Sequence, residues 1–141
     1  CEASAYGVHY RALEADRPAF SLRANEPTAA LSIAIEVGGH RAVAAVQRSD
    51  GQAILLSDEE MRDAQAVMAR QGMWVELAAA SGVAALRKLT APPAQNVRPI
   101  VCISTSSGFK DVGVGDTPLP PCDGSWSDFV RAVKSQGLSG V

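Results

Sequence analysis

A short apolar run that leads directly into a helix start is the feature that most constrains how this chain can fold. Residues 52–56 (QAILL) have the pattern of a buried strand. Ser57 and Glu60 follow at capping-box spacing, in which the serine accepts a hydrogen bond from a free N–H of the first turn and the glutamate reaches back. We therefore expect a helix that begins at Asp58 and stops near Gly72.

The rest of the chain alternates between helical and strand patterns. We expect helices at 6–14, 29–37, 40–48, 78–89 and 126–134, strands at 74–77 and 99–104, and irregular backbone at 20–26. The run 99–104 (PIVCIS) is typical of a strand buried on both faces of a parallel sheet. The alternation predicts an α/β fold with parallel strands flanked by helices, over a single segment 1–141 whose tail, 113–141, carries a final helix.

Composition and charge exclude several classes of partner. Lys and Arg number 13 against 15 Asp and Glu, so no basic excess is present to meet a phosphate backbone, and we expect no nucleic-acid partner. No apolar run approaches the roughly 20 residues of a membrane-spanning helix, so we expect a soluble, cytoplasmic protein without a membrane partner. The three cysteines, at 1, 102 and 122, lack the close spacing of zinc or redox sites, and we expect no metal and no disulfide framework.

Two places could carry chemistry. Hydroxyl residues gather at 104–108 (STSSG), directly after the expected strand 99–104, and ligands in open α/β sheets bind beyond such strand ends. The same hydroxyls could instead bond their own backbone in a polar turn. Glu76 is an acid within an apolar stretch, and it points either to solvent or into a cleft. A buried Glu76 must be paired or have a raised pKa.

Three segments taken in order resemble the C-terminal part of the pyridoxal-phosphate enzymes of the tryptophan synthase β family, which have fold type II. The segments are 54–61 (ILLSDEEM), 75–86 (VELAAASGVAAL) and 100–111 (IVCISTSSGFKD). In that family a strand leads into a V-S-D-E-E helix start, a V-E-P segment opens an alanine-rich helix, and a final strand ends in T-G-x-G-x-K-D. The chain is most similar to the threonine synthases of this group, over about residues 2–112.

The resemblance implies a role for several residues. Thr105 falls on the hydroxyl residue that hydrogen-bonds the pyridine nitrogen of pyridoxal 5'-phosphate, and Ser106 is its neighbour in the cofactor-binding segment. Glu76 falls on the family's motif glutamate in the active-site cleft, which implies a catalytic role in orienting or tuning proton transfer. Lys110 and Asp111 match the K-D pair, which we interpret as shaping the turn. A neutral hydroxyl does not hold the pyridine nitrogen in its protonated form as a carboxylate does, so the cofactor ring is a weaker electron sink. Such a ring suits elimination and replacement at Cβ or Cγ of the substrate.

Departures from the family pattern limit what this chain can do alone. Ser106 stands where the family has glycine, and its side chain limits how closely the backbone can approach the cofactor ring. Leu77 stands where the family has proline. None of the three lysines, at 88, 110 and 134, lies in the family's Schiff-base context, and Gly38-Gly39 resembles a helix stop rather than a phosphate loop. In the family both parts precede the matched region. We therefore expect the C-terminal part of a large cofactor-binding domain, inactive without an upstream part.

The function implied by the resemblance is that of a lyase of amino-acid metabolism. It would convert O-phosphohomoserine to threonine and phosphate with pyridoxal phosphate, as part of a homodimeric enzyme with a small amino-acid substrate. A serine or threonine dehydratase of the same family is one alternative. A stand-alone, non-catalytic module for ligand binding or interaction is an alternative of a different class.

Overall fold

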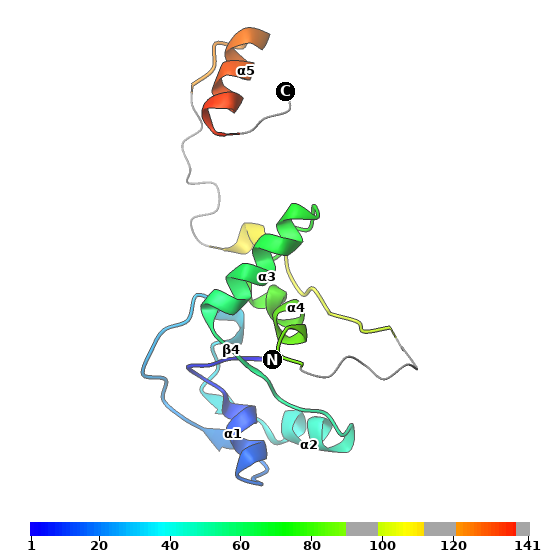
Figure 1. Cartoon of the computed structure of the whole chain (residues 1–141). Coiled ribbons are helices and arrows are strands. Elements are labelled where there is room, and N and C mark those ends of the chain that lie inside the picture. The colour runs from blue at the N-terminus through cyan, green and yellow to red at the C-terminus, as the bar shows by residue number, and fades with distance from the viewer. Residues whose placement is uncertain (90–98, 112–120, 138–141) are drawn as a thin grey trace.

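The computed structural model describes residues 1–89, 99–111 and 121–137 (Figure 1). The helices of this part are α1 (Val8–Glu14), α2 (His40–Arg48), α3 (Asp58–Arg70), α4 (Ser81–Leu86) and α5 (Trp126–Ser135), with 3-10 turns η1 (Leu31–Ile33), η2 (Leu77–Ala80) and η3 (Gly108–Lys110). Its strands are β1 (Glu2–Ala3), β2 (Phe20–Ser21), β3 (Val37–Gly38) and β4 (Leu55–Leu56). Strands β1 and β4 pair in parallel, and β2 and β3 pair antiparallel. The predicted α/β class is confirmed.

Helix α3 begins where the sequence predicts it. The Glu60 N–H donates to Ser57 Oγ at 3.2 Å, and the Ser57 N–H donates to Glu60 Oε2 at 2.7 Å, so both halves of the capping box are formed. One face of the helix, with Met61, Ala64 and Met68, is buried. Their i, i+3, i+7 spacing gives a single apolar stripe, as expected of an amphipathic helix.

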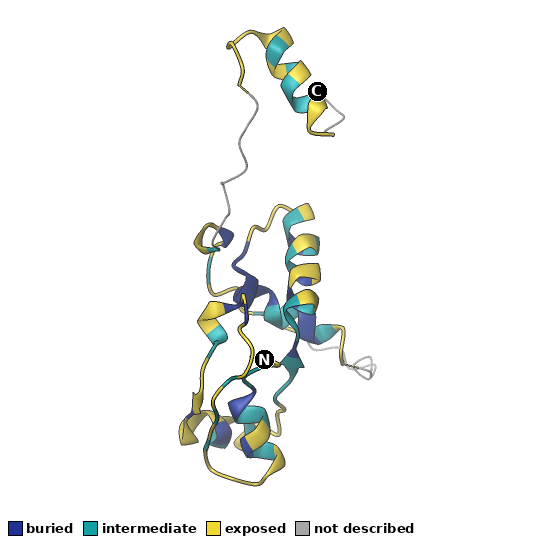
Figure 2. Ribbon diagram, turned by 90° about the vertical axis from the view of Figure 1, so that its left-hand side faces the viewer, coloured by how far each residue is buried: buried dark blue, intermediate teal, exposed yellow. Residues whose placement is uncertain are grey.

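The core lies between α3, β4 and the alanine-rich segment that forms η2 and α4. Helix α3 packs against both η2 and α4, and the buried residues of these elements belong to one hydrophobic cluster; Figure 2 colours the buried residues dark blue. The members of this cluster are Ala3, Ala30, Leu56, Met61, Ala64, Met68, Val75, Leu77, Ala78, Ala79, Ala80, Ala84 and Ala85. Because alanine side chains are small, η2 and α4 can pack closely against α3, and Leu56 and Met61 are the largest fully buried side chains of the cluster.

A second packed unit surrounds α1. The carboxylate of Glu2 accepts hydrogen bonds from the N–H groups of His9 and Tyr10, at 3.0 and 2.7 Å, and so supplies the cap that Gly7 cannot. Val8 and Val43 are fully buried between α1, α2 and the β2–β3 pair. The helix expected at 6–14 is confirmed as α1, and that expected at 40–48 as α2.

The helix expected at 29–37 is wrong. This stretch contains only the single turn η1 and Val37, the first residue of β3. The Ala29 N–H donates to Asp58 Oδ2 at 2.6 Å and Thr28 Oγ1 donates to the other oxygen of the same carboxylate, so these donors are fixed to another element. Competition from such non-local hydrogen bonds, which helical periodicity does not reveal, opposes a continuous helix here.

The buried strand expected at 99–104 is also wrong. The backbone there is irregular, and Ile100, Val101 and Ile103 are 57%, 80% and 76% exposed. Within the described ranges no strand lies beside this stretch, and a strand without a hydrogen-bonded neighbour gains nothing from its apolar side chains.

Other expected elements differ mainly in length. The strand at 52–56 is reduced to β4, the helix at 78–89 is divided into η2 and α4, and 20–26 contains β2 rather than being irregular throughout. The short strand expected at 74–77 is a single antiparallel bridge between Val75 and Ser107. Residues 91–93 (APP), which were expected to end the helix at 78–89, lie outside the described residues.

The final helix is confirmed as α5. Ser125 caps it by accepting from the Asp128 N–H at 3.2 Å, and Trp126 and Phe129 stack on its surface with ring centroids 5.4 Å apart. The rest of the expected tail, 113–120 and 138–141, lies outside the described residues. Across the residues that are described, no helix combines the length and the apolar character needed to cross a membrane.

Candidate functional site

Glu76 lies buried at the point where three segments meet. Only 5% of the residue is exposed, and its N–H donates to the carbonyl of Ser106 at 3.0 Å. Its carboxylate accepts from two side chains, with Ser32 Oγ bound to Oε1 and Lys110 Nζ bound to Oε2 at 3.0 Å. Of the two alternatives for Glu76, the structure gives the buried and paired one.

These contacts keep Glu76 ionised. The hydrogen bond from Ser32 lowers the pKa of Glu76 most, the Lys110 ammonium lowers it further, and burial opposes both by disfavouring the charge. The net effect is a Glu76 pKa below its ordinary value. A carboxylate of this kind is a fixed negative charge at neutral pH and a weak proton acceptor.

Asp111 fastens the predicted cofactor segment to the rest of the site. Its Oδ2 accepts from the Leu77 N–H at 3.0 Å and from Gln65 Nε2 at 2.6 Å. Gln65 Nε2 also donates to the carbonyl of Val75 at 2.8 Å. The side chain of this α3 residue therefore connects the segment of Val75 with the segment of Asp111, and these two segments also meet at the Val75–Ser107 bridge. The K-D pair was interpreted as shaping a turn. Its two members also bind neighbouring residues: Lys110 donates to the carboxylate of Glu76, and Asp111 accepts from the backbone N–H of Leu77.

A close approach explains the glycine of this motif. A Cβ atom added at Gly108 would lie 2.4 Å from Nε1 of Trp74, which is inside any allowed contact distance. The Gly108 N–H also donates to the carbonyl of Trp74 at 3.2 Å. The indole therefore covers the glycine, and the 105–111 segment packs at a distance that a side chain would prevent.

The three residues predicted for the site line one hollow. Thr105 is exposed, Ser106 is half-buried and Glu76 is buried, and all three border a cavity of about 430 Å³. The residues that line it are Ser32, Ile33, Glu76, Ala78, Ser81, Ile103, Thr105, Ser106 and Lys110. A second hollow of about 410 Å³ shares Ser32, Glu76 and Lys110 with the first and adds Arg62, Gln65 and Trp74, among others.

Sequence reasoning missed two donors of this site. Ser32 lies 44 residues before Glu76 in a stretch expected to be helical, and no local signal connects the two. Lys110 carried a signal, because it belongs to the matched K-D pair, but its contact with Glu76 was not predicted.

The hollow fits one edge of pyridoxal phosphate. Its exposed Thr105 hydroxyl and the neighbouring serine hydroxyls are suitable partners for a ring nitrogen. The lysines do not provide a free amine beside it: Lys110 is paired with Glu76, and Lys88 binds the Leu55 carbonyl at 2.7 Å and Glu60 at 2.9 Å. Lys134 lies on α5. The described residues therefore fit the ring-nitrogen side of the cofactor and not its point of covalent attachment.

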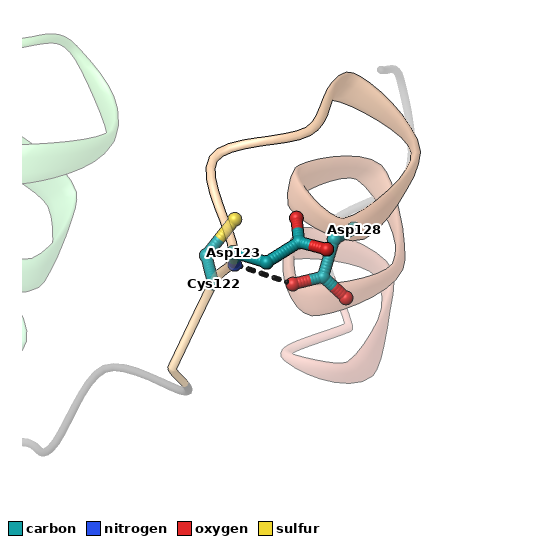
Figure 3. A group of neighbouring side chains, drawn as sticks. All are labelled: Cys122, Asp123 and Asp128. Carbon is teal, nitrogen blue, oxygen red and sulfur yellow. Dashed lines mark hydrogen bonds between the residues drawn. The ribbon is translucent and has the colours of Figure 1, made fainter.

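One further group of candidate ligand atoms lies outside this site. Cys122, Asp123 and Asp128 come together at the N-terminal end of α5, with Asp128 in its first turn (Figure 3). Asp128 Oδ2 accepts from the Asp123 N–H at 2.9 Å, and Asp123 Oδ1 accepts from the Ser125 N–H at 2.8 Å. These are the hydrogen bonds of a helix cap, which account for the grouping without an ion.

Comparison with known proteins agrees with the motifs. No family model matches the chain. The chain is 40% identical over 84 residues to threonine synthase of Methanocaldococcus jannaschii, an alignment that covers 58% of this chain and 21% of that protein. It is 36% identical over 105 residues to threonine synthase of Methanosarcina acetivorans, which covers 72% of this chain and 26% of that protein. The chain thus spans about a quarter or less of the length of these relatives. The predicted resemblance is confirmed, and over the aligned residues this chain is a threonine-synthase-like sequence.

Proposed function

We propose that this chain forms the part of a threonine-synthase-like lyase that contacts the ring-nitrogen edge of pyridoxal phosphate. One observation carries the proposal: Thr105, Ser106 and Glu76, which the motifs select from distant parts of the sequence, border the same hollow. The similarity to two threonine synthases supports the enzyme class.

Thr105 is the residue proposed to hold the cofactor ring. Its exposed hydroxyl donates a hydrogen bond to the ring nitrogen, and because a hydroxyl is neutral, it does not keep that nitrogen protonated. Pyridoxal phosphate, when bound, supplies the electron sink for elimination and replacement at the side-chain carbons of an amino acid. The Ser106 carbonyl accepts from the Glu76 N–H, which joins the segment of Thr105 to that of Glu76, and we propose the Ser106 hydroxyl as a second partner for the ring edge.

Glu76 is proposed to act as a fixed charge in the active site. Both of its oxygens already accept hydrogen bonds, and its pKa is lowered by Ser32 and Lys110, so it is poorly suited to carry protons near neutral pH. A buried anion in this position favours positive charge that develops nearby and orients groups that donate to it. This role is the orienting form of the catalytic function inferred from the motif.

The substrate and setting follow from the same resemblance. We propose that the enzyme converts O-phosphohomoserine to threonine and phosphate, works as a homodimer, and that residues 1–141 belong to its large cofactor-binding domain. The test is a chimera in which this chain replaces its aligned segment in the M. acetivorans threonine synthase, with the unaltered synthase as reference.

The chimera should bind pyridoxal phosphate, absorb in the visible region and release phosphate from O-phosphohomoserine. A folded chimera without the visible band would contradict the proposed cofactor contact. A chimera that binds the cofactor but forms ammonia and a 2-oxo acid from serine or threonine would indicate the dehydratase instead.

A further inference from the structure

The carboxylate of Glu76 is held more firmly than a charge in a cleft needs to be. Ser32 on η1 donates a hydrogen bond to Oε1, and Lys110 on η3 donates one to Oε2. Rotation of the carboxylate would break at least one of these hydrogen bonds. The backbone of Glu76 is fixed too, because its carbonyl accepts from the N–H groups of Ala79 and Ala80 at 2.9 and 3.2 Å. The side chain therefore has one orientation, which is set by two donors.

The segment that carries each donor is itself held by an acid, Asp58 for Ser32 and Asp111 for Lys110. Asp58, at the start of α3, holds Thr28 and Ala29 and so places η1 with Ser32. Asp111, the residue after Lys110, is bound by Gln65 of α3 and by the Leu77 N–H. Residues of helix α3 thus hold the segments that carry both donors. Such outer support is what keeps a functional side chain in place.

The two donors differ in charge. The Lys110 side chain is 59% exposed and that of Glu76 only 7%, so solvent weakens the ion pair from the lysine end. Ser32 is exposed as well, but its hydroxyl makes a neutral hydrogen bond to the carboxylate instead of an ion pair. Loss of either donor removes a hydrogen bond from a buried carboxylate, which is unfavourable, and leaves the other donor and the weaker contribution of the Ser106 side chain.

We propose that Ser32 and Lys110 are positioning residues for Glu76, and that each fixes one carboxylate oxygen of the active-site glutamate. This proposal rests on the proposed function only in placing Glu76 in the active site. A positioning role predicts that the hydroxyl and the ammonium are needed as donors, and that conservative replacements which keep the donor restore the effect.

The first test is the titration of Glu76 in the chimeric enzyme described above. Glutamate labelled with carbon-13 at the side-chain carboxyl reports each protonation by NMR, and Glu76→Gln identifies the signal. We expect the pKa of Glu76 to rise in Ser32→Ala and in Lys110→Met, and to return toward its original value in Ser32→Thr and Lys110→Arg. Lys134→Met, on α5, is the matched control and should leave the titration unchanged.

Two results would overturn the proposal. One is a Glu76 titration that is unchanged in both Ser32→Ala and Lys110→Met while far-UV circular dichroism shows the fold intact. The other is a Lys110→Arg variant that shifts the titration as much as Lys110→Met, since loss of packing rather than of the donor would then be responsible. Should Lys110→Met lose its fold, the comparison of Ser32→Ala with Ser32→Thr decides the question.

The second test uses the chimeric enzyme described above. Positioning predicts that Ser32→Ala lowers kcat with little change in KM and moves the acidic limb of the pH profile upward, while cofactor affinity stays within about twofold. If the chimera fails to bind pyridoxal phosphate but the Glu76 titrations behave as expected, the proposed function fails and the positioning of the carboxylate stands.

Discussion

Replacement of Asp111 by alanine should destabilise the chain through the loss of one acceptor that serves two donors. The Leu77 N–H belongs to a residue that is only 4% exposed, and without Asp111 Oδ2 it has no acceptor at its present 3.0 Å. A buried donor left unsatisfied costs about 1–3 kcal/mol, and loss of the Gln65 hydrogen bond adds about 1 kcal/mol. We therefore expect the free energy of unfolding to fall by about 2–4 kcal/mol.

Asn at the same position separates the loss of the acceptor oxygen from the loss of its charge. Its amide oxygen can still accept from the Leu77 N–H, but it lacks the charge of the carboxylate, so Asp111→Asn should cost about 1–2 kcal/mol. Urea unfolding followed by circular dichroism measures both variants, and the alanine variant should shift the midpoint by on the order of 1–2 M. Asp63→Ala, on the exposed face of α3, is the matched control. An alanine variant as stable as this control would refute the assigned role of Asp111.

Three further changes test the rest of the structure. Ser57→Ala removes one half of the capping box and should lower the free energy of unfolding, measured by urea unfolding, by about 1 kcal/mol. An unchanged free energy of unfolding would show that the cap does not stabilise the fold. Gly108→Ala should cost about 1–3 kcal/mol and shift the emission of Trp74, measured in a Trp126→Phe background, because the new methyl overlaps the indole; an unchanged emission would argue against this contact. Because its folded-state pKa is lowered, Glu76 contributes stability that is complete above its ordinary pKa of 4.5 and is lost as the pH falls through the lowered value. Glu76→Gln should flatten that acid limb in pH-dependent urea unfolding, and a limb of unchanged slope would be evidence against the linkage.

Local signals predicted the parts of the fold that depend on neighbouring residues. The capping box at Ser57 and the periodic stripe of α3 involve contacts within one turn or a few turns, and the structure contains both. The motifs also predicted that Glu76 and Thr105 belong together, although nothing in their local sequence shows that they lie on one hollow.

Contacts between distant segments explain what sequence patterns did not predict. The stretch around Ser32 has helical periodicity, but its donors bind Asp58 and Glu76, which lie about 30 and 44 residues away. The apolar run 99–104 has the composition of a buried strand, yet a strand depends on a neighbour, and none lies beside it within the described residues. Periodicity reports which face of an element is apolar and does not report which partner it meets.

The affinity of the chimeric enzyme for pyridoxal phosphate, compared between Thr105→Val and Thr105→Ser, tests the central claim most directly. Valine keeps the volume and removes the hydroxyl, whereas serine keeps the hydroxyl, and Thr105 is exposed, so neither change should disturb the fold. Loss of one hydrogen bond of about 1 kcal/mol predicts a Kd that is about fivefold to tenfold higher in Thr105→Val. Thr105→Ser should stay within about twofold of the unaltered chimera. Equal affinities for all three proteins would contradict the claim that this hollow holds the cofactor ring.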